Sequence, residues 1–262
     1  MRRFISLLRF TTGFVFVAIA STLTILIALP LLPSRSARIK LCNYYGKIVG
    51  YTVVRLAGGT PVVSNRAHLH ESYPAIFVSN HCSTIDLFAS MWICPVGGCG
   101  IAKKEVAKVP FFGWLYYLSG HLLIDRSNRE KAIAAMTEIA GVVRQHNLGI
   151  WIWPEGTRSK NGRLKPFKKG FVHLAIATGL PVVPVAVHGA HTLWQKKELM
   201  FVPGELKIDV LPAIDTSGWK AEDAGAIAQD VHDIFAAALT LDQQPLLTDA
   251  PAEQTEKQEV PV

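Results

Sequence analysis

The sequence predicts an α/β protein in which a mixed, largely parallel sheet is covered by helices, with a hydrophobic, membrane-associating helical hairpin at the amino terminus. Short apolar runs typical of buried strands alternate with helical segments across residues 60–240. A long uncharged run and a basic helical segment precede them in residues 1–59. Residues 241–262 are polar and contain prolines, which is typical of a disordered tail. These three segments form the predicted domain organisation.

The amino-terminal run extends from Phe10 to Ser34 without a charged residue. As a helix, about 20 apolar residues cover roughly 30 Å, which matches the hydrocarbon thickness of a bilayer. The apolar core of a signal peptide is shorter, about 7–15 residues, and no clean cleavage site follows this run. A buried core helix would be less uniformly apolar. We therefore expect a membrane-associated helix that ends near Pro30 and Pro33.

A second helix is expected over residues 38–59, where apolar side chains recur at helical spacing among basic ones and Gly58 and Gly59 mark the end. The basic residues on either side of the apolar run nearly balance, so the positive-inside rule gives no orientation. Two arrangements stay open. The first helix spans the bilayer, or the hairpin lies in one leaflet with both of its ends in the cytosol.

The region after the hairpin alternates between strands and helices, which predicts a sheet covered on both faces. An S-x-x-E capping box at Ser127 and Glu130 marks the start of one helix, and Gly179 marks the end of another. The expected strands are residues 74–80, 99–104, 121–126, 149–154, 180–189 and 205–212, and the expected helices are 83–93, 127–147, 164–179 and 220–239.

The composition narrows the class of partner. A net charge of +7 points to an anionic ligand or surface, and an apolar fraction of 50% favours a membrane over nucleic acid, for which no signature is present. The 4 cysteines lack the paired spacing of a zinc site. We expect them to be reduced, mostly buried thiols, and we expect no metal site. His188 and His191 have no evident third ligand and are interpreted as structural.

The stretch NHCSTID places polar side chains where the first expected strand ends. His81 follows the strand directly, and Asp86 falls in the first turn of the next helix. Ligands of such sheets bind at the carboxyl ends of the strands. A carboxylate that accepts Nδ1–H of His81 would fix the imidazole tautomer and leave Nε2 free to take a proton from a hydroxyl. A structural histidine beside an aspartate would look the same, so the pair alone leaves both interpretations open.

A basic loop follows another strand, in WPEGTRSKNGRLKPFKKG at residues 153–170. Its lysines and arginines surround a glycine and a hydroxyl, a composition that suits a phosphate. The alternatives are a solvated loop or contact with anionic lipid headgroups. A further strand end carries Asp125 and Arg126 in GHLLIDRS.

Taken together, NHCSTID, GHLLIDR, PEGTRS and LPVVPV resemble the four ordered motifs of the glycerolipid acyltransferase superfamily, and most of all those of the 1-acylglycerol-3-phosphate acyltransferases. The resemblance covers about residues 74–187. It implies that His81 of the NH-x4-D motif is a general base, that Asp86 orients it, and that no acyl-enzyme forms. The absence of a G-x-S-x-G nucleophile agrees with this, and Cys82 is not expected to be a nucleophile.

The resemblance also implies the substrates. A fatty acyl group would pass from acyl-CoA or acyl-carrier protein to the sn-2 hydroxyl of 1-acyl-sn-glycerol 3-phosphate, giving phosphatidic acid in phospholipid biosynthesis, without a cofactor or metal. The protein would act at the cytoplasmic face of a bacterial inner membrane. Its implied substrate-binding residues are Lys103, Arg126, Glu155, Gly156, Thr157 and Arg158.

Two other functions stay open: acyl transfer to another lysolipid, such as a lysophospholipid or lyso-ornithine lipid, and membrane-lipid binding without turnover. Two departures from the family pattern, Leu123 and Trp153, leave the acyl-chain length and head-group shape undecided. The apolar stretch at residues 109–118 lines an acyl-chain tunnel or packs in the core.

Overall fold

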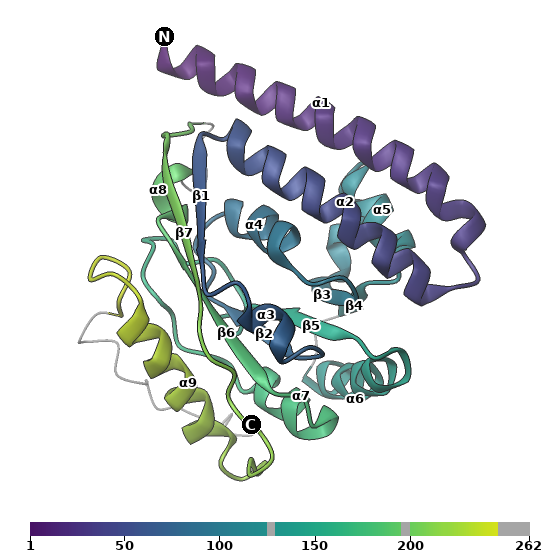
Figure 1. The fold of residues 1–262 in the computed structure, drawn as a ribbon, viewed down its shortest axis with the longest axis vertical. Coiled ribbons are helices and arrows are strands. Elements are labelled where there is room, and N and C mark those ends of the chain that lie inside the picture. The colour runs from purple at the N-terminus through teal and green to yellow at the C-terminus, as the bar shows by residue number, and fades with distance from the viewer. Residues whose placement is uncertain (125–128, 195–199, 246–262) are drawn as a thin grey trace, which may run out of the picture.

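The computed structural model describes residues 1–124, 129–194 and 200–245, and for residues 129–137 it describes the backbone alone. These residues contain a seven-stranded sheet in which only β6 and β7 are antiparallel neighbours (Figure 1). The predicted fold class is therefore confirmed. In spatial order the strands are β1 (Gly59–Ser64), β7 (Gly204–Val210), β6 (Val182–His188), β2 (Ile76–Ser79), β5 (Gly149–Ile152), β3 (Gly98–Lys103) and β4 (Leu122–Ile124).

Helices cover both faces of the sheet, because successive residues of each strand point to opposite sides. Ile76 and Val78 of β2 pack in a core cluster with α6, α7 and α9, whereas Phe77 packs in a second cluster with α2, α4 and α8. The described helices are α1 (Arg2–Ala28), α2 (Arg35–Leu56), α3 (His68–Glu71), α4 (Ile85–Ile93), α5 (Phe112–Leu118), α6 (Arg129–His146), α7 (Gly170–Thr178), α8 (Ala190–Leu193) and α9 (Ala224–Ala238), with 3₁₀ turns η1 (Leu29–Leu31) and η2 (Lys104–Lys108).

All six expected strands are present, and β1 is an additional strand that the sequence pattern did not reveal. Pro61 interrupts it, and proline is tolerated there because β1 lies at the edge of the sheet. The helix expected from residue 164 begins only at Gly170, because the preceding basic residues remain in an irregular loop. Gly179 ends this helix in the left-handed conformation, with φ of +69°, as predicted. Ser127, half of the expected capping box, lies outside the described residues.

The amino-terminal hairpin is present: α1 and α2 lie side by side, joined through η1 (Figure 1). α2 packs closely on α4, because Gly50 has no side chain and a Cβ there would overlap the main-chain oxygen of Phe88. The side chain of Asn43 donates to the oxygen of Gly98 at 2.9 Å and accepts from Gly97 N–H at 2.7 Å. α2 is thereby tied to the start of β3, and α1 lies outside it.

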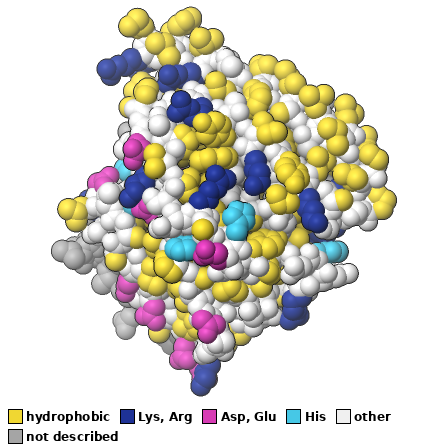
Figure 2. All heavy atoms as spheres, in the orientation of Figure 1, with side chains coloured by type: hydrophobic (Ala, Val, Ile, Leu, Met, Phe, Trp, Pro, Cys, Tyr) yellow, Lys and Arg dark blue, Asp and Glu magenta, His cyan; other side chains and the backbone are white. Residues whose placement is uncertain are grey.

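α1 has an inverted distribution of side chains compared with the helix of a soluble protein. Its buried residues are small or polar, Ser6, Ser21, Thr24 and Ala28, and Ser21 hydrogen-bonds Tyr45 of α2 at 2.8 Å. Its large apolar side chains are exposed, and they form the apolar surface over α1 in Figure 2. Small residues between helices and large ones outside are typical of helices that face lipid. Within the described residues, α1 with η1 is the helix long and apolar enough to cross a membrane.

The carboxyl-terminal segment is ordered further than the sequence suggested. A disordered tail was expected from residue 241, yet Gln243 is fully buried. Its side chain accepts from Gly189 N–H at 2.9 Å, and its main-chain oxygen accepts from Leu164 N–H at 2.7 Å. The boundary of the folded domain therefore lies beyond Gln243, because this polar side chain satisfies main-chain groups at the end of β6. Residues 246–262 of the expected tail lie outside the described residues.

Candidate active site

The candidate active site lies where neighbouring parallel strands end. β2 pairs with β5 in parallel, so the residues that follow these two strands come out at the same edge of the sheet. His81 follows β2, and the stretch Trp153–Glu155 follows β5. The strand order thus brings together NHCSTID and PEGTRS, which are about 70 residues apart in the chain.

His81 and Asp86 form a hydrogen-bonded pair. Nδ1 of His81 lies 3.0 Å from Oδ2 of Asp86, and because a carboxylate can only accept, Nδ1 carries the proton. The same Oδ2 accepts N–H of Cys82 and of Ser83, each at 2.7 Å. Asp86 is buried in the first turn of α4, where the helix N-terminus favours its negative charge.

The imidazole of His81 is held in place and remains accessible. Its ring stacks on Trp153, with centroids 4.7 Å apart and planes inclined by 21°. The side chain is 17% exposed. Because Nδ1 contacts Asp86, Nε2 on the other side of the ring points away from that carboxylate. The predicted pairing of His81 with Asp86 is therefore present, and the ring can accept a proton from a bound ligand.

The PEGTR turn holds the main chain of His81 from two sides. Oε1 of Glu155 accepts His81 N–H at 2.6 Å, and Ser159 N–H donates to the oxygen of His81 at 2.8 Å. Burial, followed by the nearby carboxylate of Asp86, raises the pKa of Glu155 to about 8. Glu155 thus lies behind the histidine, whereas the family resemblance implied a substrate contact for it.

The other predicted binding residues occupy different positions around this turn. Gly156 has φ of +71°, and Lys168 packs against it, so that a Cβ there would lie 3.1 Å from Nζ of Lys168. Thr157 is exposed, and Arg158 is partly buried. Nη1 of Arg158 donates to Oγ1 of Thr84, which precedes α4. These contacts hold Arg158 against the residue that precedes α4 and Lys168 against the PEGTR turn.

The two remaining predicted binding residues are Lys103 and Arg126. Lys103 is the last residue of β3, which is separated from β2 by β5, and its side chain is exposed at the same edge of the sheet. Arg126 lies outside the described residues. Binding roles for both stay predictions.

Cys82 is unsuited to act as a nucleophile. Its side chain is 4% exposed, and burial raises the pKa of its thiol well above the usual value. A thiolate is needed for nucleophilic attack, so the neutral buried thiol is inert.

The two histidines of HGAH form their own carboxylate contacts, His188 with Asp209 at 3.0 Å and His191 with Asp242 at 3.5 Å. Among the described residues there is no cluster of three or more metal-ligating side chains.

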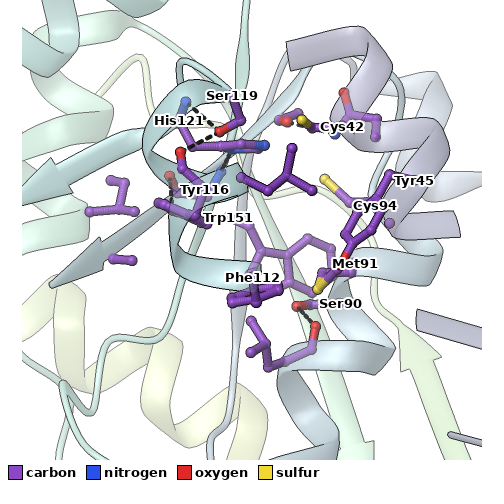
Figure 3. A pocket seen from close by; sticks show the side chains of 18 of the residues that line it. Cys42, Tyr45, Ser90, Met91, Cys94, Phe112, Tyr116, Ser119, His121 and Trp151 are labelled. Carbon is purple, nitrogen blue, oxygen red and sulfur yellow. Dashed lines mark hydrogen bonds between the residues drawn. The ribbon is translucent and has the colours of Figure 1, made fainter. Parts of the chain in front are cut away.

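A narrow apolar cavity of about 100 Å³ lies beside the site, between α2, α4 and α5 (Figure 3). Trp153, whose ring stacks on His81, is part of its wall. The polar groups at one end are satisfied internally: Tyr116 donates to the oxygen of Gly100 at 2.8 Å, and Nδ1 of His121 accepts Gly100 N–H at 2.9 Å. Burial lowers the pKa of His121 to about 4. The cavity is therefore uncharged and suited to a hydrocarbon chain.

A larger cavity of about 320 Å³ lies between α1, α2, α4 and the segment around α5. Thr84, the partner of Arg158, is part of its wall. Phe111 and Phe112 also line this cavity, and both belong to the apolar stretch 109–118, which was expected to line a tunnel or to pack in the core. Trp114 and Tyr117 of the same stretch are exposed. The apolar stretch is thus divided between cavity walls and the molecular surface.

Comparisons with known proteins show the family of this chain. A family model described as Acyltransferase matches residues 60–188. The 1-acyl-sn-glycerol-3-phosphate acyltransferase of Limnanthes douglasii is 42% identical over 221 residues, which are 84% of this chain and 78% of that protein. The chain belongs to the 1-acyl-sn-glycerol-3-phosphate acyltransferase family.

Other relatives of this acyltransferase carry the same name. The protein of Cocos nucifera is 37% identical over 244 residues, 93% of this chain and 79% of its own. The human alpha form is 36% identical over 165 residues, 63% of this chain and 58% of its own. The crystal structure of a 1-acyl-sn-glycerophosphate (LPA) acyltransferase from Thermotoga maritima has the same fold, with a TM-score of 0.76 at 22% identity, covering 90% of this chain and 94% of that one.

Sequence reasoning missed two contributors to the acyltransferase site. Thr84 was not singled out although it lies inside NHCSTID and contacts Arg158. Asn80 uses both ends of its side-chain amide on Val187, donating at 2.9 Å and accepting at 2.8 Å, and so ties the end of β2 to β6. Both residues are in the motif, and an asparagine directly after a buried strand is a signal of such a tie.

Proposed function

We propose that this protein transfers a fatty acyl group from an acyl thioester to the sn-2 hydroxyl of 1-acyl-sn-glycerol 3-phosphate, giving phosphatidic acid. The observation that carries the proposal is the His81–Asp86 pair, 3.0 Å apart, next to Arg158 at one edge of the sheet. Relatives named 1-acyl-sn-glycerol-3-phosphate acyltransferase over most of the chain support the same reaction.

In this reaction Nε2 of His81 takes the proton of the sn-2 hydroxyl as its oxygen attacks the thioester carbonyl carbon. The tetrahedral intermediate then collapses, the carbon–sulfur bond breaks, and the imidazolium returns the proton to the leaving thiolate. Asp86 stabilises the transient imidazolium through Nδ1–H. The acyl group passes directly between the substrates, in keeping with the buried, neutral thiol of Cys82.

The phosphate of the acceptor binds beside this pair in our proposal. Arg158 offers a planar fork of N–H donors, which suits two phosphate oxygens at once. The ammonium of Lys168 lies next to Gly156 and adds a second positive charge. Arg126 and Lys103 are assigned to the same substrate on the family resemblance. A cationic group at this place favours a phosphorylated acceptor over a lyso-ornithine lipid.

The two apolar cavities fit the two hydrocarbon chains of the reaction. The cavity of about 100 Å³ reaches Trp153, which contacts His81, so we assign it to the chain of the acyl donor. The cavity of about 320 Å³ reaches Thr84 and is walled partly by α1, so we assign it to the chain of the lysolipid. An acyl-CoA or acyl-carrier-protein thioester serves as donor, and the reaction as written needs no cofactor.

The exposed apolar face of the hairpin supports a reaction at a membrane surface. α1 exposes its large apolar side chains and buries small ones against α2, which supports insertion into one leaflet with α2 and the sheet beneath it. The catalytic domain would then lie on the side of the soluble acyl donor, at the cytoplasmic face of a bacterial inner membrane.

The experiment is an acyl-transfer assay with the full-length protein in vesicles that contain one lysolipid at a time. 1-Acyl-sn-glycerol 3-phosphate, a lysophospholipid with a substituted head group, and lyso-ornithine lipid are each offered with acyl-CoA and with acyl-carrier protein. We expect activity with the first acceptor, and loss of it by about 10²–10⁴-fold in His81→Ala. His173→Ala, at an exposed histidine of α7, is the matched control and should keep activity.

Each other outcome decides against part of the proposal. If the protein prefers another lysolipid, the proposed acceptor is wrong and the proposed acyl transfer stands. Full activity of His81→Ala removes the general base. Lipid binding without turnover on any acceptor favours a non-catalytic lipid-binding protein.

A further inference from the structure

The carboxyl group of Glu155 faces the main chain of His81 and is closed off from the open side of the site. Its Oε1 accepts His81 N–H at 2.6 Å, and the residue is 3% exposed. Its Oε2 is buried and has no hydrogen-bond partner among the residues that the structure describes. A substrate phosphate would need to reach a donor in open space, whereas the carboxyl group of Glu155 is buried behind the histidine and its Oε1 is already an acceptor for His81 N–H.

Glu155 and Asp86 are two buried carboxyl groups that accept hydrogen bonds from neighbouring residues of the same turn, which begins at His81. The two groups accept different numbers of hydrogen bonds. Asp86 gathers three donors on one oxygen: the ring of His81 and the amides of Cys82 and Ser83. Glu155 accepts the amide of His81 at 2.6 Å, and the main chain of Lys165 adds a smaller stabilisation of its charge. Two nearby carboxyl groups repel each other when both are ionised, so Asp86 is one of the causes that raise the pKa of Glu155.

Other charged and titratable groups around Glu155 do not reverse this rise of its pKa. Lys165 lowers the pKa of Glu155 and Asp86 raises it, and burial is the largest effect, so the net value is about 8. Cys82, the buried thiol next to His81, has its own pKa raised well above the usual value and remains neutral. Below about pH 8 the carboxyl group of Glu155 is therefore protonated.

We propose that Glu155 is a positioning residue: through Oε1 its buried carboxyl group holds the main chain of His81, and with it the ring stacked on Trp153, and it does not bind the substrate. This role rests on the proposed function of His81 as the general base. The family resemblance had implied a substrate contact for the same residue.

The test compares Glu155→Gln and Glu155→Ala with the matched control Glu205→Gln, at an exposed glutamate of β7. Glutamine is neutral and keeps an oxygen acceptor for His81 N–H. We expect Glu155→Gln to keep kcat and the KM of the acceptor within about threefold. Glu155→Ala leaves a buried N–H without its acceptor, so we expect kcat to fall about 10–100-fold with the KM of the acceptor nearly unchanged.

The pH profile adds a readout that a purely structural residue would not change. In the wild-type protein Glu155 loses its proton as the pH rises through about 8, and the new charge beside Asp86 weakens the arrangement. We expect the activity to fall on that alkaline side, and we expect this fall to be absent in Glu155→Gln. If Glu155→Gln were as impaired as Glu155→Ala, or kept the wild-type alkaline fall, the proposed role of Glu155 would be wrong.

A substrate ligand would give a different pattern. A KM of the acceptor raised tenfold or more at unchanged kcat in Glu155→Ala would overturn the positioning role. The ¹³C signal of the His81 ring, identified by its loss in His81→Ala, provides a test that does not depend on turnover. We expect one ring signal in the wild type and Glu155→Gln and a broadened or doubled signal in Glu155→Ala. An unchanged ring signal in Glu155→Ala would refute positioning even if the proposed acyl transfer failed.

Discussion

Replacing Asp86 by asparagine tests the geometry of the candidate active site most directly. Oδ2 of Asp86 accepts from the His81 ring at 3.0 Å and from two main-chain amides at 2.7 Å. Asparagine has nearly the same size, so the change removes charge and leaves volume almost unaltered. The turn should stay folded, since an amide oxygen can still accept the two N–H groups.

The size of the effect follows from the interaction that is lost. At 3.0 Å a carboxylate and an imidazolium attract each other by about 5.5 kcal/mol at an effective dielectric constant of about 20. The ring is 17% exposed, so water screens part of this attraction. We take about 2–4 kcal/mol as the lost stabilisation of the imidazolium, which corresponds to a fall in kcat of about 30–1,000-fold.

The assay follows release of the donor thiol under saturating lysolipid and donor, so that kcat and KM separate. We expect kcat to fall and the KM of the acceptor to change little, because Asp86 contacts His81 and not the ligand. Asp209→Asn is the matched control, since Asp209 pairs with His188 at the same 3.0 Å, and it should keep kcat within about twofold. An Asp86→Asn protein with more than half of the wild-type kcat would contradict the assignment of Asp86.

Three further predictions concern the ligand, the core and the membrane. Arg158→Lys replaces a planar fork by a point charge and should raise the KM of the phosphorylated acceptor about tenfold with kcat little changed; an equal loss with a phosphate-free acceptor would speak against a phosphate contact. Gly50→Ala forces a Cβ into the main chain of α4 and should destabilise the protein by about 1–3 kcal/mol, seen as a lower Tm, whereas an unchanged Tm would show that α2 and α4 do not pack this closely. Ile19→Asp puts a charge on the exposed apolar face of α1 and should lower vesicle binding about tenfold or more; undiminished binding would place the membrane surface elsewhere.

The sheet and the pairing of His81 with Asp86 could be predicted because both follow from local sequence patterns. Buried strands appear as short apolar runs, and the polar residues that end two parallel neighbours meet at one edge. His81 and Asp86 are five residues apart, so a strand end and one helical turn suffice to join them. β1 was not predicted because it contains a proline, which is unusual in a strand away from the edge of a sheet. The start of α7 was predicted at residue 164, before its actual start at Gly170, because the residues of the basic loop are compatible with a helix.

The surroundings of the pair could not be predicted because they depend on contacts between distant segments. Glu155 and His81 are 74 residues apart, and only the pairing of β2 with β5 turns the glutamate toward the histidine amide. Composition also did not reveal which side of α1 faces outward, since that depends on whether α2 accepts small or large side chains. The stacking of Trp153 on His81 and the two cavities follow from the same three-dimensional neighbourhood.

The inverted surface of α1 has a kinetic consequence for the reaction. Inserted in a bilayer as proposed, through the exposed isoleucine, leucine and phenylalanine side chains of α1, the protein would encounter a lipid acceptor by diffusion in two dimensions. Its rate should then follow the mole fraction of lysolipid in the vesicle, and diluting the acceptor with inert lipid should slow turnover even at constant bulk concentration. The water-soluble donor should obey ordinary saturation in volume concentration.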